Sequence, residues 1–153
     1  MSKIYIYLAG PIRGVSERGA CEWREVVTKA LAGANDNYVA VSPLRCEPPD
    51  AEGMYPVDYS WELAHSITAK NQLDVGRCDA VLAYLPRGAV SVGTILEIGW
   101  ASAKGKTVII VSDDPVLLSH PILMATVPFR FDSSKQGWKK ALTMLTDLYG
   151  VYI

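Results

Sequence analysis

The sequence predicts a single α/β domain spanning residues 1–153, in which five short strands alternate with helices. Short apolar runs typical of buried strands are separated by longer segments whose apolar residues recur at helical spacing. The clearest unit covers residues 80–111, where two apolar runs flank a segment of helical length. Because parallel strands need a crossover connection, usually a helix, this unit predicts two parallel strands joined by a helix.

The other elements follow from the same local patterns. The expected strands are short and apolar, and they comprise residues 3–9, 38–41, 78–85, 106–111 and 128–131. The expected helices comprise residues 17–32, 60–75, 91–103 and 133–149. Between the last two strands, residues 113–124 are expected to form a loop with a short helix around His120 and Pro121.

Apolar spacing also predicts which side of two helices faces the core. In the helix 17–32 this side comprises Cys21, Trp23, Val26, Val27, Ala30 and Leu31, and in the helix 133–149 it comprises Trp138, Leu142, Leu145 and Leu148. The proline-rich segment 43–58 is longer than most connections in a compact domain. Such loops are often functional, so we expect it at the rim of a binding site.

Composition excludes several classes of function. The formal net charge is −1 and the basic residues form no run or stripe, so polymeric nucleic acid is not an expected partner. No apolar stretch approaches the roughly 20 residues that span a bilayer, and the chain opens directly on a strand-like run, so we expect no membrane contact and a cytoplasmic protein. The three cysteines and two histidines show no metal-ligand spacing, which predicts free thiols and no metal site.

Glu97 is the most unusual residue of the sequence, because it is the only charged side chain in the small and apolar segment 91–103. It is expected near the start of a helix that follows a strand, where open α/β sheets bind ligands. Gly93 and Ala101 share its helical face and leave room for a flat or ring-shaped molecule. The alternative is a structural glutamate paired with a base one turn away, but position 101 is alanine. The residues alone leave both interpretations open.

Three further features surround this candidate. The turn at residues 9–14 contains two glycines and Arg13, whose guanidinium suits phosphate or carboxylate recognition, although a plain strand-to-helix turn would look the same. Asn71 and Asp74 lie one turn apart on the expected second helix. Asp79 is expected at the amino end of its strand, opposite the ligand edge, which favours a structural role.

Several of these motifs occur together in a known family. YLAGPIRG at residues 7–14, CDAVLA at residues 78–83, SVGT at residues 91–94 and EIGWA at residues 97–101 keep the order and spacing of the nucleoside 2-deoxyribosyltransferase superfamily. The sequence resembles this superfamily, including its deoxynucleoside 5′-monophosphate N-glycosidases, over most of its length. The G-T-x-x-E-x-G-[YW]-A block combined with the tyrosine and glycine turn of the first strand is the most specific part.

The resemblance implies a fold, partners and a reaction. The fold would be a doubly wound five-stranded parallel sheet, flavodoxin-like or Rossmann-like. The protein would be a homo-oligomer, dimer or larger, with sites near subunit contacts, no metal and no organic cofactor. Its substrate would be a small-molecule nucleoside or nucleotide, whose anomeric carbon is attacked by Glu97 to give a covalent glycosyl-enzyme. A second base or water would then accept the sugar.

The resemblance also assigns roles to neighbouring residues. Tyr7 would orient the nucleophile by a hydrogen bond, while Gly10, Ile12, Arg13 and Gly14 would surround the sugar and its 5′ end. Gly93 would leave space for the substrate beside the nucleophile. Ser91 stands where the nucleoside transferases tend to carry aspartate and the monophosphate N-glycosidases carry serine. Together with Arg13, this serine favours a 5′-phosphorylated substrate.

Two positions depart from the family pattern. Asn71 stands where the family usually has an aspartate near the departing base, so either Asp74 protonates the base, or the Asn71 amide binds it without a general acid, or activity is reduced. Ile122 stands where a neighbouring subunit often supplies a polar residue, and His120 is the candidate substitute. These departures keep open the alternative of a catalytically silent nucleotide-binding module. A transferase acting on unphosphorylated nucleosides is the alternative to the preference inferred from Ser91 and Arg13.

Overall fold

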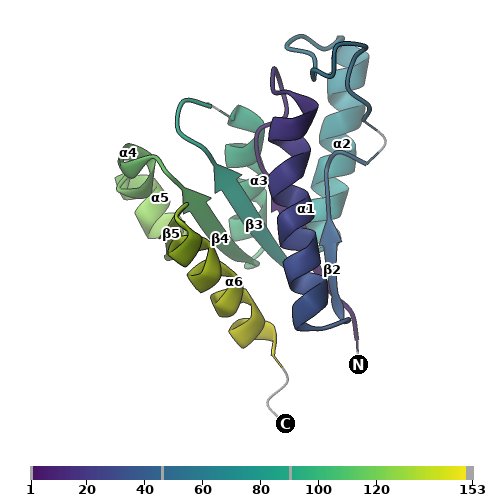
Figure 1. The fold of residues 1–153 in the computed structure, drawn as a ribbon. Helices are drawn as coiled ribbons and strands as arrows, with labels where there is room; N and C mark the ends of the chain where they lie inside the picture. Colours follow the sequence, from purple (N-terminus) through teal and green to yellow (C-terminus); the bar gives the residue numbers. More distant parts are fainter. Residues whose placement is uncertain (1, 46, 90, 151–153) are drawn as a thin grey trace.

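The computed structural model describes residues 2–45, 47–89 and 91–150 (Figure 1). The strands are β1 (Ile4–Ala9), β2 (Tyr38–Val41), β3 (Ala80–Leu85), β4 (Thr107–Ser112) and β5 (Phe129–Asp132). The helices are α1 (Glu17–Ala34), α2 (Trp61–Arg77), α3 (Val92–Ala103), α4 (Pro115–Leu118), α5 (Pro121–Thr126) and α6 (Lys135–Tyr149). The expected elements are therefore confirmed with small shifts of their ends, and the segment 113–124 contributes to two short helices.

The five strands form one parallel sheet in the order β2-β1-β3-β4-β5. The chain starts at β1, moves outward to β2, and returns across β1 to continue with β3 on the other side. The doubly wound fold is thus confirmed, with its reversal of direction between β1 and β3. At such a switch point the connections that leave the two strands diverge, which opens a crevice at their carboxyl ends.

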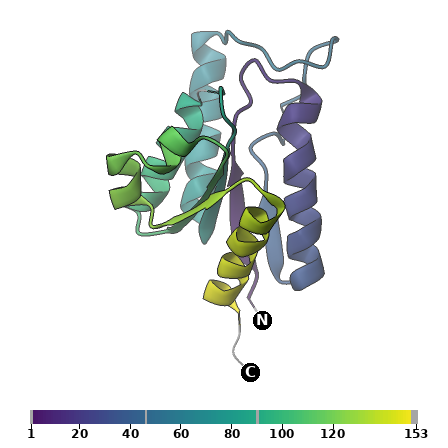
Figure 2. The ribbon, with the colours of Figure 1, turned by 60° about the vertical axis from the view of Figure 1, so that its left-hand side comes forward.

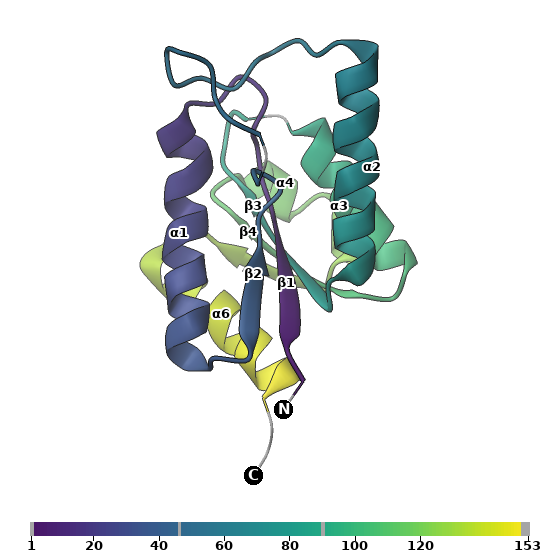
Figure 3. The ribbon, with the colours of Figure 1, turned by 90° about the vertical axis from the view of Figure 1, so that its right-hand side faces the viewer.

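Helices cover both faces of the sheet, which explains why the strands are apolar on both sides. In Figure 3, α1 and α6 lie on one face while α2 and α3 lie on the other. One buried cluster lies under α1 and α6 and includes Leu8, Val27, Leu82 and Leu145. The other lies under α2 and α3 and includes Tyr7, Val75, Val81, Ile98 and Ile110. These two clusters fix the helices against the sheet, and the crevice lies at the carboxyl ends of the strands.

Serine side chains begin the four long helices. Ser16, Ser60, Ser91 and Ser134 each accept a hydrogen bond from the backbone N–H three residues further on. This contact satisfies one of the free N–H groups of the first turn. In α3 the cap determines where the helix starts, and it therefore places Glu97 in the second turn.

Two predicted helix faces need correction. In α1 the buried residues are Ala20, Arg24, Val27 and Leu31, whereas Val26 is 62% exposed. The apolar pattern gave the wrong phase because Arg24 belongs to the buried face, where backbone carbonyls satisfy its guanidinium. In α6 the side chain of Leu148 is 46% exposed, because that face of the last turn extends past the apolar cluster.

The loop between β2 and α2 is anchored to the turn that follows β1. Tyr55 N donates to Val15 O at 2.9 Å and Glu17 N donates to Gly53 O at 2.8 Å. Ser16 and Met54 form an antiparallel bridge within this contact. Figure 2 shows the loop passing above the carboxyl end of the sheet, between the start of α1 and the start of α2. The expected rim position of this loop is therefore confirmed for its described residues.

Candidate active site

A cavity of about 250 Å³ lies at the carboxyl ends of β1 and β3, at the switch point of the sheet. Its walls come from the turn after β1, the loop before α2, one face of α2 and the start of α3. Seven of the predicted site residues line it: Gly10, Ile12, Arg13, Asn71, Ser91, Gly93 and Glu97. Four segments that are distant in the sequence thus converge on one space.

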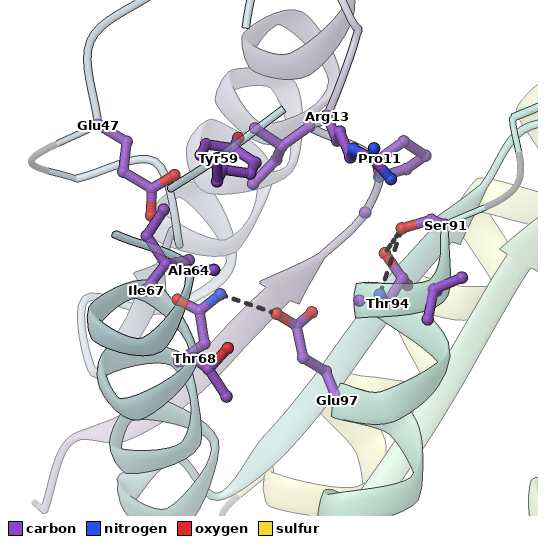
Figure 4. A pocket seen from close by; sticks show the side chains of 15 residues that line it. Pro11, Arg13, Glu47, Tyr59, Ala64, Ile67, Thr68, Ser91, Thr94 and Glu97 are labelled. Carbon is purple, nitrogen blue, oxygen red and sulfur yellow. Dashed lines mark hydrogen bonds between the residues drawn. The ribbon is translucent and has the colours of Figure 1, made fainter. Parts of the chain in front are cut away.

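Glu97 lines this cavity as a buried carboxylate held at one oxygen. The residue is 6% exposed, and Oε1 accepts a hydrogen bond from Tyr7 Oη at 2.9 Å. The same oxygen accepts a second hydrogen bond from Asn71 Nδ2 at 3.1 Å (Figure 4). Oε2 accepts no hydrogen bond from a described residue. No described lysine or arginine forms an ion pair with Glu97. The alternative of a structural glutamate paired with a base one turn away is therefore excluded within the described chain.

Burial determines the protonation of this carboxyl group. Removal from water raises the pKa of Glu97 to about 7, while the Tyr7 hydrogen bond, the charge of Arg24 and the Asn71 hydrogen bond act in the opposite direction. The pKa of Tyr7 is also raised, first by burial and then by the neighbouring carboxylate, so its hydroxyl keeps its proton and donates. Glu97 is consequently poised to be ionised just above neutral pH.

Arg24 is a buried cation that sequence reasoning missed. Its side chain reaches from α1 to the end of β1, where Nε donates to Leu8 O at 3.2 Å and Nη2 donates to Gly10 O at 3.0 Å. It is 3% exposed, and burial lowers its pKa to about 10. It holds the backbone of the glycine turn and contributes positive potential at Glu97. In the sequence, the only sign that Arg24 is buried was its helical spacing from Val27 and Leu31, which lie on the same face of α1.

Glycine is required at two positions of this turn, at one by packing and at the other by the backbone conformation. A Cβ atom on Gly10 would lie 2.6 Å from the ring of Trp23 and 3.2 Å from Tyr84 O, so no larger residue fits. Gly14 has φ of +69°, a left-handed conformation that favours glycine, and does not line the cavity. Gly14 therefore shapes the turn, whereas Gly10 and Ile12 form part of the wall.

Arg13 and Ser91 lie on the same side of the cavity (Figure 4). Arg13 is 63% exposed, donates from Nε to Val57 O, and approaches Asp58 Oδ1 at 3.5 Å. The Ser91 hydroxyl caps α3 and lies 2.5 Å from the Thr94 hydroxyl. The guanidinium and the start of α3 thus make this side suitable for an anion.

Asn71 and Asp74 are both buried, but they have different surroundings. The Asp74 carboxylate forms a two-pronged ion pair with Arg45 and does not line the cavity of Glu97. It faces a second hollow that also contains Ser42 and Cys78. The helical spacing correctly placed the two residues near one another. The Asp74 carboxylate, however, binds Arg45 of the preceding loop outside the cavity. Asp74 is therefore not positioned to protonate a ligand in the cavity.

His120 is exposed at the start of α5 and does not line the cavity. Its side chain makes no capping hydrogen bond to the helix. Ile122, the neighbouring departure from the family pattern, is 71% exposed. Within one copy of the chain, the structure does not bring either residue to Glu97.

The loop before α2 contributes two residues that were not predicted. Glu47 and Tyr59 line the cavity, and Glu47 Oε1 accepts a hydrogen bond from Lys70 Nζ at 2.8 Å. Lys70 also donates to the backbone of Pro43 and Arg45, which fixes the loop against α2. The sequence placed this loop at the rim, but it contained no signal for which of its side chains point inward.

Comparison with known families identifies the chain. A sequence model described as nucleoside 2-deoxyribosyltransferase matches residues 6–141, and this range contains every element that forms the cavity. The chain belongs to this family. The resemblance drawn from the sequence motifs is confirmed, and the nucleoside 2-deoxyribosyltransferase family acts on small nucleosides or nucleotides. No protein of curated function matches the sequence.

Solved structures share the fold of this deoxyribosyltransferase-family chain. They include a 2-deoxyribosyltransferase from Bacillus psychrosaccharolyticus, with 20% identity, a TM-score of 0.56, and coverage of 80% of this chain and 82% of that chain. A conserved protein from Enterococcus faecalis V583 has 16% identity and a TM-score of 0.63, with 94% and 99% covered. A CMP N-glycosidase from Clostridium botulinum has 23% identity and a TM-score of 0.51, with 95% and 98% covered.

Within residues 2–45, 47–89 and 91–150, no three histidine, cysteine, aspartate or glutamate side chains are grouped so that they could hold a metal ion. In the same part of this family member, no helix has both the length and the apolar character that a membrane crossing requires.

The raised pKa of Glu97 predicts how stability depends on pH. Between pH 4.5 and about 7 the unfolded chain ionises this group while the folded chain keeps it protonated, so the free energy of unfolding falls as pH rises. Above pH 7 both states are ionised and the effect is constant. Glu97→Gln should therefore raise the free energy of unfolding by roughly 3 kcal/mol at pH 8 and by much less at pH 5.

Urea unfolding of the wild type and the variant at both pH values measures this difference. Glu52→Gln, the same change at an exposed position in the loop before α2, is the matched control. A gain in stability for Glu97→Gln that is equal at pH 5 and pH 8 would contradict the assignment of a buried, titrating carboxyl group.

Proposed function

We propose that this protein cleaves the N-glycosidic bond of nucleosides or deoxynucleosides, preferentially as their 5′-monophosphates, through a covalent glycosyl-enzyme on Glu97. One observation carries the proposal: a buried carboxylate lines a small cavity, with one oxygen held by two donors and the other oxygen without a protein donor among the described residues. Membership of the nucleoside 2-deoxyribosyltransferase family supports the reaction class.

In the proposed first step, Glu97 Oε2 attacks the anomeric carbon and forms a C–O bond. The C–N bond to the base breaks, and its electron pair leaves with the base. The Tyr7 hydroxyl and the Asn71 amide remain on Oε1, so the attacking oxygen is oriented without being blocked. Negative charge near the anomeric carbon stabilises the positive charge that develops on the sugar in the transition state.

In the second step, water or another base attacks the same carbon and releases Glu97. With water the protein is an N-glycosidase; with a base it is a deoxyribosyltransferase. Relatives of the same fold carry both descriptions, as a CMP N-glycosidase and as a 2-deoxyribosyltransferase. We favour the monophosphate N-glycosidase because Arg13 and the start of α3 can receive a 5′-phosphate, and because position 91 is an uncharged serine.

We propose no residue of α2 as the acid that protonates the departing base. Asn71 has no acidic proton, and the Asp74 carboxylate is occupied by Arg45. We therefore assign Asp74 a positioning role, in which its ion pair holds the loop before α2 at the rim. The amide in place of an acid also favours a second candidate, a silent module that binds a nucleotide without turnover. Release of free base from any nucleotide excludes that candidate.

The first functional test is base release by the wild type and by Glu97→Gln. The variant keeps the shape of the side chain but removes the nucleophile, so we expect loss of at least about a thousandfold in kcat with every substrate. For the wild type, kcat/KM should rise with pH and level off above about pH 7, where Glu97 is ionised.

Chromatography of free base from deoxynucleosides and their 5′-monophosphates, with and without an acceptor base, measures all of these quantities. Denaturing mass spectrometry should also detect the sugar on the wild type and not on the variant. Base release that persists in Glu97→Gln would remove the covalent mechanism, and release that needs an acceptor base would make the protein a transferase.

Two glycines of α3 give a matched test of where the substrate lies. A Cβ atom on Gly93 or on Gly99 would meet nothing within 4 Å, so alanine fits either position and should stabilise the helix by roughly 0.5–1 kcal/mol. Only Gly93 lines the cavity. Gly93→Ala should therefore raise KM about tenfold or more while Gly99→Ala leaves KM unchanged, because the new methyl group takes substrate space.

Steady-state kinetics and thermal unfolding of the two variants check this expectation. An unchanged KM in Gly93→Ala, with the expected gain in stability, would show that the substrate does not approach this part of α3.

We further propose that the protein is a homo-oligomer that associates through the α2–α3 layer. Apolar side chains remain outside on these helices: Leu73 is 56% exposed, Val92 is 67% exposed and Leu96 is 49% exposed. Val92 also lines the cavity, so a partner on this layer would lie next to the site. A partner would remove this apolar surface from water.

Sedimentation analysis should therefore give a dimer or larger species for the wild type. Leu73→Glu should shift it toward the monomer, because the new charge would be buried at the contact. Val26→Glu, at an equally apolar and 62% exposed position on α1, should leave the assembly unchanged. A monomeric wild type at micromolar concentration would contradict this proposal.

A further inference from the structure

The cavity has opposite electrostatic character at its two ends. Arg13 and Ser91 lie on one side of Glu97, whereas Glu47 and Ile67 lie on the other side, against α2 (Figure 4). A phosphate is attracted by the guanidinium and repelled by the Glu47 carboxylate. With the anomeric carbon at Glu97, a bound nucleotide would therefore direct its phosphate toward Arg13 and its base toward α2.

At the α2 end, Asn71 presents an acceptor. Its Nδ2 donates one N–H to the Glu97 carboxylate at 3.1 Å, which fixes the orientation of the amide and leaves its oxygen and its second N–H for other partners. The residue is 9% exposed, and Oδ1 is buried without a hydrogen-bond partner among the described residues. A buried acceptor without a donor lowers stability, and a donor on the ligand would satisfy it.

Glu47 adds a second acceptor to the same end. Lys70 Nζ donates to Oε1 at 2.8 Å, which holds the side chain in place. Oε2 accepts no hydrogen bond from a described residue. The Glu47 side chain as a whole is 14% exposed.

The other polar groups at this end do not discriminate. The hydroxyls of Tyr59 and Thr68 also line the cavity, and a hydroxyl can donate or accept according to its partner. Tyr59 and Ile67 supply apolar surface for a flat ring. The fixed acceptors are the orphaned amide oxygen of Asn71 and the carboxylate of Glu47, and the carboxylate has no N–H to offer a carbonyl.

We propose that Glu47 and Asn71 form a base-recognition site that selects bases carrying an exocyclic amino group over their oxo counterparts. An amino group donates to these oxygens, whereas a carbonyl at the same place sets acceptor against acceptor. The inference rests on the proposed function, because it takes the nucleotide orientation from Glu97 and Arg13. It adds the class of base and makes Glu47 a specificity-determining residue.

Two pairs of substrates test the site, since each pair exchanges an amino group for a carbonyl: dCMP with dUMP, and dAMP with dIMP. At pH 8 the wild type should show kcat/KM at least about tenfold higher for the amino member of the pair that it cleaves better. In Glu47→Gln the ratio should fall below about threefold, because the new amide can turn an N–H toward a carbonyl. Equal values for both wild-type pairs, or an unchanged ratio in the variant, would overturn the proposal.

Glu52→Gln is the matched control, because it makes the same change in the same loop at an exposed residue outside the cavity. It should keep the wild-type ratio. If circular dichroism shows that Glu47→Gln does not fold, Glu47→Ala replaces it with the same expected ratio, because it also removes the carboxylate.

The design separates this inference from the proposed function. If no nucleotide is cleaved, the proposed function is contradicted. Calorimetry then measures the Kd of the same four nucleotides for the wild type and for Glu47→Gln. A tenfold preference for the amino members that is lost in the variant would uphold the base site in a protein without turnover. Equal affinities, or no binding of any of the four, would overturn it.

Discussion

The buried carboxylate of Glu97 is the constraint on which the rest of the site depends. A carboxyl group taken out of water favours its neutral form, and this protein offsets that tendency with two hydrogen-bond donors and a nearby buried arginine. Those groups come from β1, α1 and α2, and each is itself held by the sheet or its helices. Arg24 shows how far the support extends, because it is satisfied by backbone carbonyls at the end of β1.

The topology of the sheet explains why these groups meet. Reversal of strand order between β1 and β3 sends the chain to opposite faces, so the turn after β1 and the start of α3 border a common crevice. The loop after β2 closes the rim because its backbone pairs with that turn. This arrangement gives the cavity a cationic side and an acceptor-rich side, and a nucleotide has matching polarity in its phosphate and its amino-bearing base.

Asn71 illustrates how one change of residue alters the chemistry of such a cavity. An aspartate there could exchange a proton with a ligand, but it would also place two carboxyl groups side by side and raise the pKa of one of them. The amide avoids this repulsion and donates to Glu97, at the cost of leaving its oxygen without a protein donor among the described residues. In the proposed site, a donor on the ligand would satisfy Asn71 Oδ1.

The sequence alone determined the strands and the helices, because apolar periodicity is a local feature. Its resemblance to a known family implied the doubly wound sheet, and its motifs singled out Glu97 as the candidate nucleophile. It also placed Tyr7, Gly10, Arg13 and Ser91 near the site. Only the tertiary structure showed that Arg45 removes Asp74 from the cavity, that Arg24 is buried, and that Glu47 faces inward. Those outcomes depend on contacts between segments far apart in the chain, and no local pattern encodes which partner a long charged side chain will reach.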